Sequence, residues 1–211
     1  GESQYATGFE NKDLGIVENL WCVGGEHHAS GKPGMYAEAM QEMVNWLKKA
    51  ADVAENEKQK EGIEALIVYY LTGDLKKFDE YSITWAKNTE GDIDFIHGFI
   101  EVYGDPIGFR GSYESVIFIK DKEASKRMTS LGENAQWFED NAPIPAEYKK
   151  KEVKGISYKV ITVINEAGDA APSTPIGINL PNSNWIRQQH GSKAVSLGNI
   201  ENAYHNAGGS G

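Results

Sequence analysis

Two asparagines, Asn179 and Asn182, stand at the exit of a short apolar run, with Pro181 between them. A side-chain amide offers hydrogen-bond donors and an acceptor, so a pair of amides can hold a small charged or polar group without carrying charge. Pro181 lacks a backbone donor and cannot lie inside a sheet ladder. The run therefore predicts an open strand end where a ligand binds. The alternative is an ordinary strand-to-helix junction, with Asn182 or Ser183 capping the helix.

Six blocks of the sequence are distinctive, namely residues 98–108, 110–114, 133–140, 177–182, 190–193 and 195–199. In their order and spacing they resemble the dipeptidyl peptidase III family, and residues 133–140 resemble its bacterial branch. The resemblance covers most of the sequence and is clearest from about Asp94 to Asn206. Several long blocks in register are more specific than any single short motif.

That family consists of zinc exopeptidases that remove dipeptides from the amino terminus of peptides. Their metal site needs the pattern H-E-x-x-G-H and a later glutamate on a second helix, and none of the five histidines here begins that pattern. The resemblance therefore implies a fragment of a larger enzyme, the part that receives the peptide. We expect no catalytic residue, no metal site and no activity in this chain alone. Zinc is expected in the full-length enzyme, in a lobe formed by the remainder of the same polypeptide.

The resemblance also implies a set of residues that bind the peptide substrate. Backbone hydrogen bonds to an added peptide strand supply affinity without demanding sequence, and Gly177 permits a close approach of two backbones. Asn179 and Asn182 match asparagines that contact the substrate amino terminus. Asp94 falls where the family has an acidic residue for the same end, its alternative being a solvated acid at a strand start. The predicted substrate-binding residues are Asp94, Thr174, Pro175, Ile176, Gly177, Ile178, Asn179 and Asn182.

The chain departs from the family at Ile96. Many members carry a tyrosine here that helps to stabilise the transition state, and isoleucine has no hydrogen-bond donor. This puts the tyrosine's role in doubt for this chain.

An Asp before Pro and an Arg among carboxylates often hold a turn together. We therefore interpret the nearby polar residues as mainly structural: Glu101, Asp105, Arg110 and Glu114.

Composition excludes several classes of partner. The net charge of −10 argues against nonspecific nucleic-acid binding, which needs a basic face, and against binding to an anionic membrane surface. No stretch of about 18 apolar residues is present. Cys22 is the only cysteine, so no internal disulfide forms, and a reducing compartment is permitted. We expect a cytoplasmic protein; the alternative, which a missing natural N-terminus would allow, is a periplasmic or exported one.

The periodicity of apolar residues predicts an α+β fold, with an N-terminal helical layer followed by a mixed strand and helix segment. That segment would form one side of a two-lobed peptidase cleft. The expected domains are residues 1–90, an irregular segment plus three helices (35–54, 59–71, 75–87), and residues 91–211, the substrate-binding segment. Strands are expected at 93–103, 113–120, 158–164 and 174–180, and helices at 122–140, 183–190 and 200–207, the last capped by Asn199.

Three functions remain open at this point. The chain is the substrate-binding portion of a zinc dipeptidyl peptidase, a noncatalytic peptide-binding module, or a structural or interaction domain. The last would be favoured if Asn179, Asn182 and Asp94 lay far apart in space.

Overall fold

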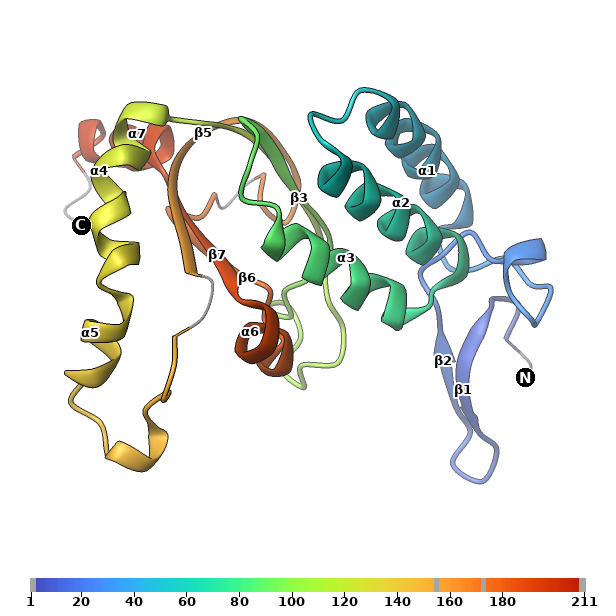
Figure 1. Ribbon diagram of the computed structural model, residues 1–211. Helices are drawn as coiled ribbons and strands as arrows, with labels where there is room; N and C mark the ends of the chain where they lie inside the picture. Colours follow the sequence, from blue (N-terminus) through green and yellow to red (C-terminus); the bar gives the residue numbers. More distant parts are fainter. Residues whose placement is uncertain (1–2, 154–155, 172–173, 209–211) are drawn as a thin grey trace. The chain divides into compact units, whose positions relative to one another are not determined.

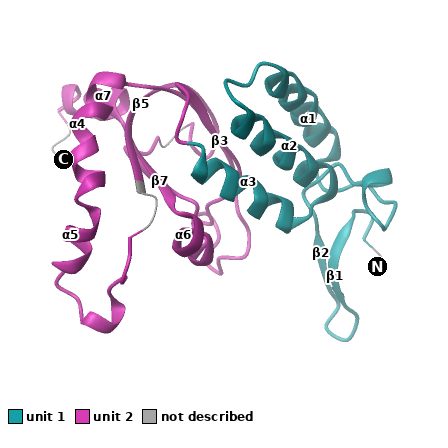
Figure 2. Ribbon diagram, in the orientation of Figure 1, with its two compact units in different colours: residues 1–88 teal, residues 89–211 magenta. Residues whose placement is uncertain are grey.

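The computed structural model describes residues 3–153, 156–171 and 174–208 (Figure 1). The chain divides into two compact units, residues 1–88 and residues 89–211 (Figure 2). Helices dominate the first unit and a mixed sheet the second, so the predicted α+β class is confirmed. None of the helices in the described ranges is both long enough and apolar enough to cross a bilayer.

The first unit contains a β-hairpin and three α-helices. Its elements are β1 (Thr7–Asn11), β2 (Ile16–Asn19), η1 (Gly25–His27), α1 (Ala37–Asp52), α2 (Glu57–Thr72) and α3 (Leu75–Lys87). Gly73 adopts a left-handed conformation with φ 75° and ends α2. Asp74 then caps α3 by accepting a hydrogen bond from Lys76 N at 2.9 Å. Both roles follow from the residue types, since glycine tolerates positive φ and aspartate favours the N-cap.

The second unit is built on a five-stranded sheet of order β3-β4-β5-β7-β6. Its strands are β3 (Ile93–Phe99), β4 (Tyr113–Lys120), β5 (Ile156–Gly168), β6 (Gly177–Leu180) and β7 (Ser192–Leu197). All pairs are antiparallel except β5 and β7. The remaining elements are α4 (Lys122–Glu133), α5 (Ala135–Asp140), η2 (Ala146–Tyr148), α6 (Asn184–His190) and α7 (Gly198–Asn206).

This sheet is strongly curled, as the bend of β5 shows (Figure 1). In a flat sheet, β3 and β7 would lie roughly 14 Å apart, because neighbouring strands are about 4.8 Å apart. Yet Lys193 on β7 donates a hydrogen bond to Asp94 on β3 at 2.7 Å. The curl buries apolar side chains from all five strands: Ile96, Val116, Phe118, Ile161, Leu180, Val195 and Leu197.

The elements differ from the expectations at several places. The strand predicted at 93–103 ends at Phe99. The strand predicted at 174–180 begins only at Gly177, so Thr174 and Pro175 precede it. The helix predicted at 122–140 is interrupted at Asn134. Strand β7 was not predicted at all. Asn199 was expected to cap a helix, but its amide instead bonds the backbone N and O of Val163, both at 3.0 Å.

Candidate functional site

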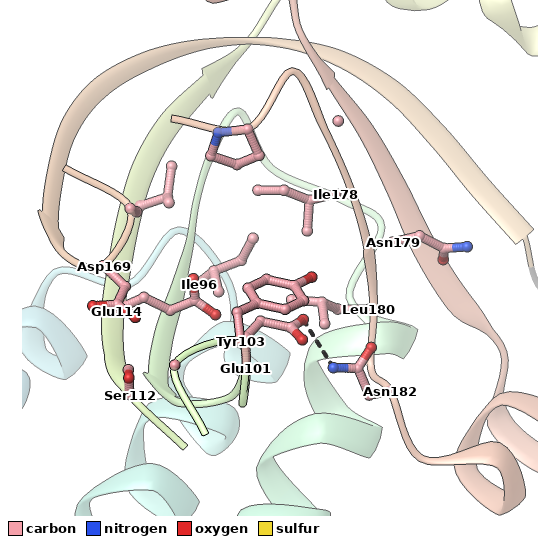
Figure 3. A pocket seen from close by; sticks show the side chains of 15 residues that line it. Ile96, Glu101, Tyr103, Ser112, Glu114, Asp169, Ile178, Asn179, Leu180 and Asn182 are labelled. Carbon is pink, nitrogen blue, oxygen red and sulfur yellow. Dashed lines mark hydrogen bonds between the residues drawn. The ribbon is translucent and has the colours of Figure 1, made fainter. Parts of the chain in front are cut away.

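The two edge strands of the curled sheet approach each other just beyond their ends. Asn182, which follows β6, donates a hydrogen bond from Nδ2 to Glu101 Oε1 at 2.9 Å, and Glu101 follows β3 (Figure 3). Asn182 therefore does not cap α6: Ser183 occupies the N-cap position and makes no side-chain cap bond. The side-chain contact closes one end of the sheet around a hollow.

That hollow is a cavity of about 570 Å³. It is lined by β3 and the loop after it, the start of β4, the turn after β5 and all of β6. Its lining residues are Ile96, Glu101, Tyr103, Gly104, Ser112, Glu114, Val116, Asp169, Ala170, Pro175, Gly177, Ile178, Asn179, Leu180 and Asn182. Three of them carry carboxylates and none is a lysine, arginine or histidine, so the cavity has an uncompensated negative charge.

The negative charge of the cavity has its clearest effect on the pKa of Glu114. This residue lies on the same side of the cavity as Asp169 (Figure 3), since Glu114 pairs with Gly168, the residue before Asp169. Burial, followed by repulsion from Glu101 and Asp169, raises the pKa of the Glu114 carboxyl to about 7. A cation in the cavity would relieve this repulsion, because an opposite charge nearby favours the ionised carboxylate.

A structured loop supplies Tyr103 to the same cavity. The Asp105 carboxylate accepts hydrogen bonds from the backbone N–H groups of Ile107, Phe109 and Arg110 at 2.8–3.0 Å. These bonds lower the pKa of Asp105, and they fix the loop between β3 and β4. The carboxylate of Glu101 raises the pKa of the Tyr103 phenol. Asp105 is thus structural, as its position before proline predicted.

Strand β6 offers an open edge beside the cavity. It pairs only with β7 among the strands of the described residues. Leu197 N donates to Ile176 O at 3.0 Å. Hydrogen-bonded pairs alternate along an antiparallel ladder, so Ile178 and Leu180 also bond to β7. The backbone N–H and C=O groups of Gly177 and Asn179 therefore point away from β7, where an added strand can reach them.

Most of the predicted binding residues meet at this cavity. Pro175, Gly177, Ile178, Asn179 and Asn182 all line it, together with Ile96. The Asn179 amide points away from the carboxylate cluster, whereas that of Asn182 points toward Glu101 (Figure 3).

Three of the predicted residues do not line the cavity. Thr174 donates its hydroxyl to Glu166 Oε2 at 2.7 Å. The Ile176 side chain is exposed, while its backbone pairs with β7. Asp94 forms an ion pair with Lys193, whose side chain is only 2% exposed. Desolvation lowers the pKa of Lys193, and the Asp94 carboxylate opposes that shift. The role of Asp94 at the substrate amino terminus stays a prediction.

Sequence reasoning missed the three carboxylates and the phenol of the cavity as ligand contacts: Glu101, Glu114, Asp169 and Tyr103. Glu101 and Glu114 had been interpreted as structural. Asp169 and Glu114 come together only through the pairing of β4 with β5, which a single sequence does not reveal. The available signal was the position of each carboxylate at a strand end, next to a glycine-containing turn.

No group of three or more His, Cys, Asp or Glu side chains is arranged to hold a metal ion in the part of the chain that the structure describes. An ammonium group carries one charge and donates three hydrogen bonds, so its chemistry suits the three carboxylates that line the cavity.

Comparison with known proteins identifies the relatives of this chain. The family model described as Peptidase family M49 matches residues 23–209. The chain is 30% identical over 171 residues to Dipeptidyl peptidase 3 of Nematostella vectensis. The match covers 81% of this chain and 23% of that protein. The chain thus spans about a quarter of the length of this curated relative.

Two solved structures have a similar fold. The structure of DPP III from Caldithrix abyssi matches with a TM-score of 0.72 and 27% identity, covering 83% of this chain and 34% of that one. Dipeptidyl-peptidase III from Corallococcus sp. strain EGB matches with a TM-score of 0.72 at 21% identity, over 82% of this chain and 32% of that one. The latter similarity concerns the fold alone.

Proposed function

This chain belongs to Peptidase family M49, and we propose that its second unit is the peptide-binding segment of a dipeptidyl peptidase. The observation that carries the proposal is the meeting of an open strand edge and three carboxylates in one cavity. The complete enzyme would remove dipeptides from the amino terminus of peptides. Its zinc would be held by the remainder of the polypeptide, because the described residues offer no ligand group.

The peptide would bind as an added strand beside β6. The outward N–H and C=O groups of Gly177 and Asn179 would pair with its backbone, which gives affinity without regard to side chains. The absence of a side chain at Gly177 lets another backbone approach closely. The fold itself has room for a Cβ at this position, which would meet only Val195 O, at 3.6 Å. Replacement by alanine would therefore leave the fold intact and add bulk beside the bound peptide.

The amino-terminal ammonium would enter the carboxylate cluster. Glu101, already held by Asn182 at 2.9 Å, and Glu114 are placed to accept its hydrogen bonds. Burying an ammonium is costly unless it is paired, and charge-assisted hydrogen bonds provide that pairing. Such an end stop would measure the distance from the amino terminus to the bond that the enzyme cuts.

Asp94 is the second candidate for the ammonium contact, from the sequence prediction. Its ion pair with Lys193 opposes that role, because Lys193 already satisfies its charge. The two possibilities differ in their mutants. Glu101→Gln should weaken peptide binding without loss of stability, whereas Asp94→Asn should destabilise the fold by leaving Lys193 buried without its carboxylate.

The test is calorimetric titration of the 211-residue chain with an alanine tetrapeptide and with its N-acetylated form. We expect the free-amine peptide to bind and the acetylated one to bind at least about tenfold more weakly, as for the loss of one charge-assisted bond. Glu101→Gln and Asn182→Ala should abolish the difference. Asn45→Ala, an exposed change on α1 in the other unit, is the matched control. Equal binding of both peptides, or none of either, would refute the proposal.

A further inference from the structure

A second hollow lies at the other end of the sheet, away from the carboxylate cluster. It is a groove of about 780 Å³ bounded by α4, the end of β4 and the start of β5. Four lysines line it, namely Lys120, Lys122, Lys126 and Lys159, against a single carboxylate, Glu133. This charge is opposite to that of the chain as a whole, which carries a net −10.

Local ion pairs do not cancel the charge of this groove. Lys122 pairs with Asp92 at 2.6 Å. Neither Lys120 nor Lys126 has an ion-pair partner within the described ranges. Four lysines against the two carboxylates of Glu133 and Asp92 leave a formal charge of plus two.

Lys159 shows how the lysines affect one another. Its Nζ donates to the backbone O of Thr89 at 2.7 Å, and its side chain is half-buried. Burial lowers the pKa of Lys159, and repulsion from Lys193 and Lys120 adds to this, with Asp94 and Asp92 opposing. Lys193 does not line the groove, and it forms an ion pair with Asp94. Asp94 and Asp92 offset only part of the repulsion among these lysines, and an anion bound in the groove would relieve the rest.

The groove also offers a hydroxyl donor. The hydroxyls of Tyr158 and Ser125 are used within the fold: Tyr158 bonds Ser196 at 2.6 Å, and Ser125 bonds the backbone N and O of Val160. The Ser157 hydroxyl forms no hydrogen bond with any other described residue. It is therefore available to a ligand, beside the ammonium groups.

We propose that this groove binds a small phosphate-bearing anion, held by Lys120, Lys126 and Lys159 with the Ser157 hydroxyl. A phosphate carries close to two negative charges at neutral pH and has oxygens on several sides, which matches cations spread around one hollow. A monocarboxylate carries half that charge on one planar group. The inference is independent of the peptide site, because the two hollows share no lining residue.

The test is calorimetric titration of the 211-residue chain at low ionic strength with pyrophosphate, inorganic phosphate, glycerol 1-phosphate and acetate. The wild-type chain should bind at least one of the phosphate compounds saturably, and more tightly than acetate. Tightest binding of inorganic phosphate or pyrophosphate would identify the free anion as the ligand, and tightest binding of glycerol 1-phosphate a phosphate ester.

The variant Lys120→Gln/Lys126→Gln should weaken phosphate binding by at least about tenfold, since it removes two charged donors. The control Lys58→Gln/Lys76→Gln makes the same change of charge at exposed positions in the first unit and should bind as the wild type does. Thermal unfolding would verify that both variants fold. The proposal is overturned if no phosphate compound binds saturably, if acetate binds as tightly, or if the control loses as much affinity as the groove variant.

Discussion

Replacing Glu114 by glutamine should stabilise the fold at neutral and alkaline pH, but not near pH 4. The carboxyl of Glu114 has a pKa of about 7 in the folded chain, against roughly 4.3 when unfolded. The folded state therefore holds this proton more tightly than the unfolded state does. The stability from proton binding is fully present below about pH 4 and is lost as the pH rises through about 7.

The size of the effect follows from the shift. At about 1.4 kcal/mol for each pKa unit, the full shift corresponds to at most ~4 kcal/mol. Glu114 is only half-buried, and solvent screening reduces such effects. We therefore expect Glu114→Gln to raise the free energy of unfolding by about 1–2 kcal/mol at pH 8. Near pH 4, where Glu114 is protonated, the variant and the wild type should have nearly equal stability.

The assay is urea denaturation of the 211-residue chain at pH 4 and pH 8, followed by circular dichroism. Glu147→Gln, an exposed glutamate in the same unit, is the control and should show no pH-dependent gain. The reasoning is refuted if Glu114→Gln is no more stable than the wild type at pH 8, or if its gain is as large at pH 4.

Three further sets of substitutions test the rest of the fold. Lys193→Met should cost about 3–5 kcal/mol in the free energy of unfolding, because Asp94 is left without its cation; Lys193→Met/Asp94→Asn should recover part of that loss. Gly168→Ala should lower the melting temperature far more than Gly108→Ala. Both glycines have positive φ, but a Cβ at Gly168 would lie 2.0 Å from Tyr113 O, and one at Gly108 no closer than 4.0 Å to any neighbour. Asp105→Ala should speed the hydrogen exchange, measured by NMR, of the three loop amides that donate hydrogen bonds to the Asp105 carboxylate.

The sequence predicted those elements whose apolar residues repeat with a clear period. The helix expected at 75–87 is confirmed, because its apolar spacing and the Gly73-Asp74 boundary agree. Strand β7 escaped prediction because its buried side chains include Ser192 and Lys193, which read as polar surface. The family resemblance of the blocks from residue 98 onward is also confirmed.

The candidate site was only partly predictable for a different reason. Asn182 could be singled out because its type and its place after a strand suggest a binding group. Glu114 and Asp169 could not, since their proximity depends on the register of β4 against β5. Nor does the sequence reveal that curling of the sheet brings Lys193 to Asp94. The packing of strands decides which charges are compensated, and therefore which remain for a ligand.

The central claim is that the carboxylate cavity beside β6 receives the amino terminus of a peptide. The most direct measurement is a crystal structure of the 211-residue chain with a free-amine tetrapeptide bound. We predict the peptide to lie antiparallel or parallel to β6, paired with the backbone of Gly177 and Asn179, with its ammonium within hydrogen-bond distance of Glu101 or Glu114. A peptide bound elsewhere, or one whose ammonium points away from the cavity into solvent, would contradict the account.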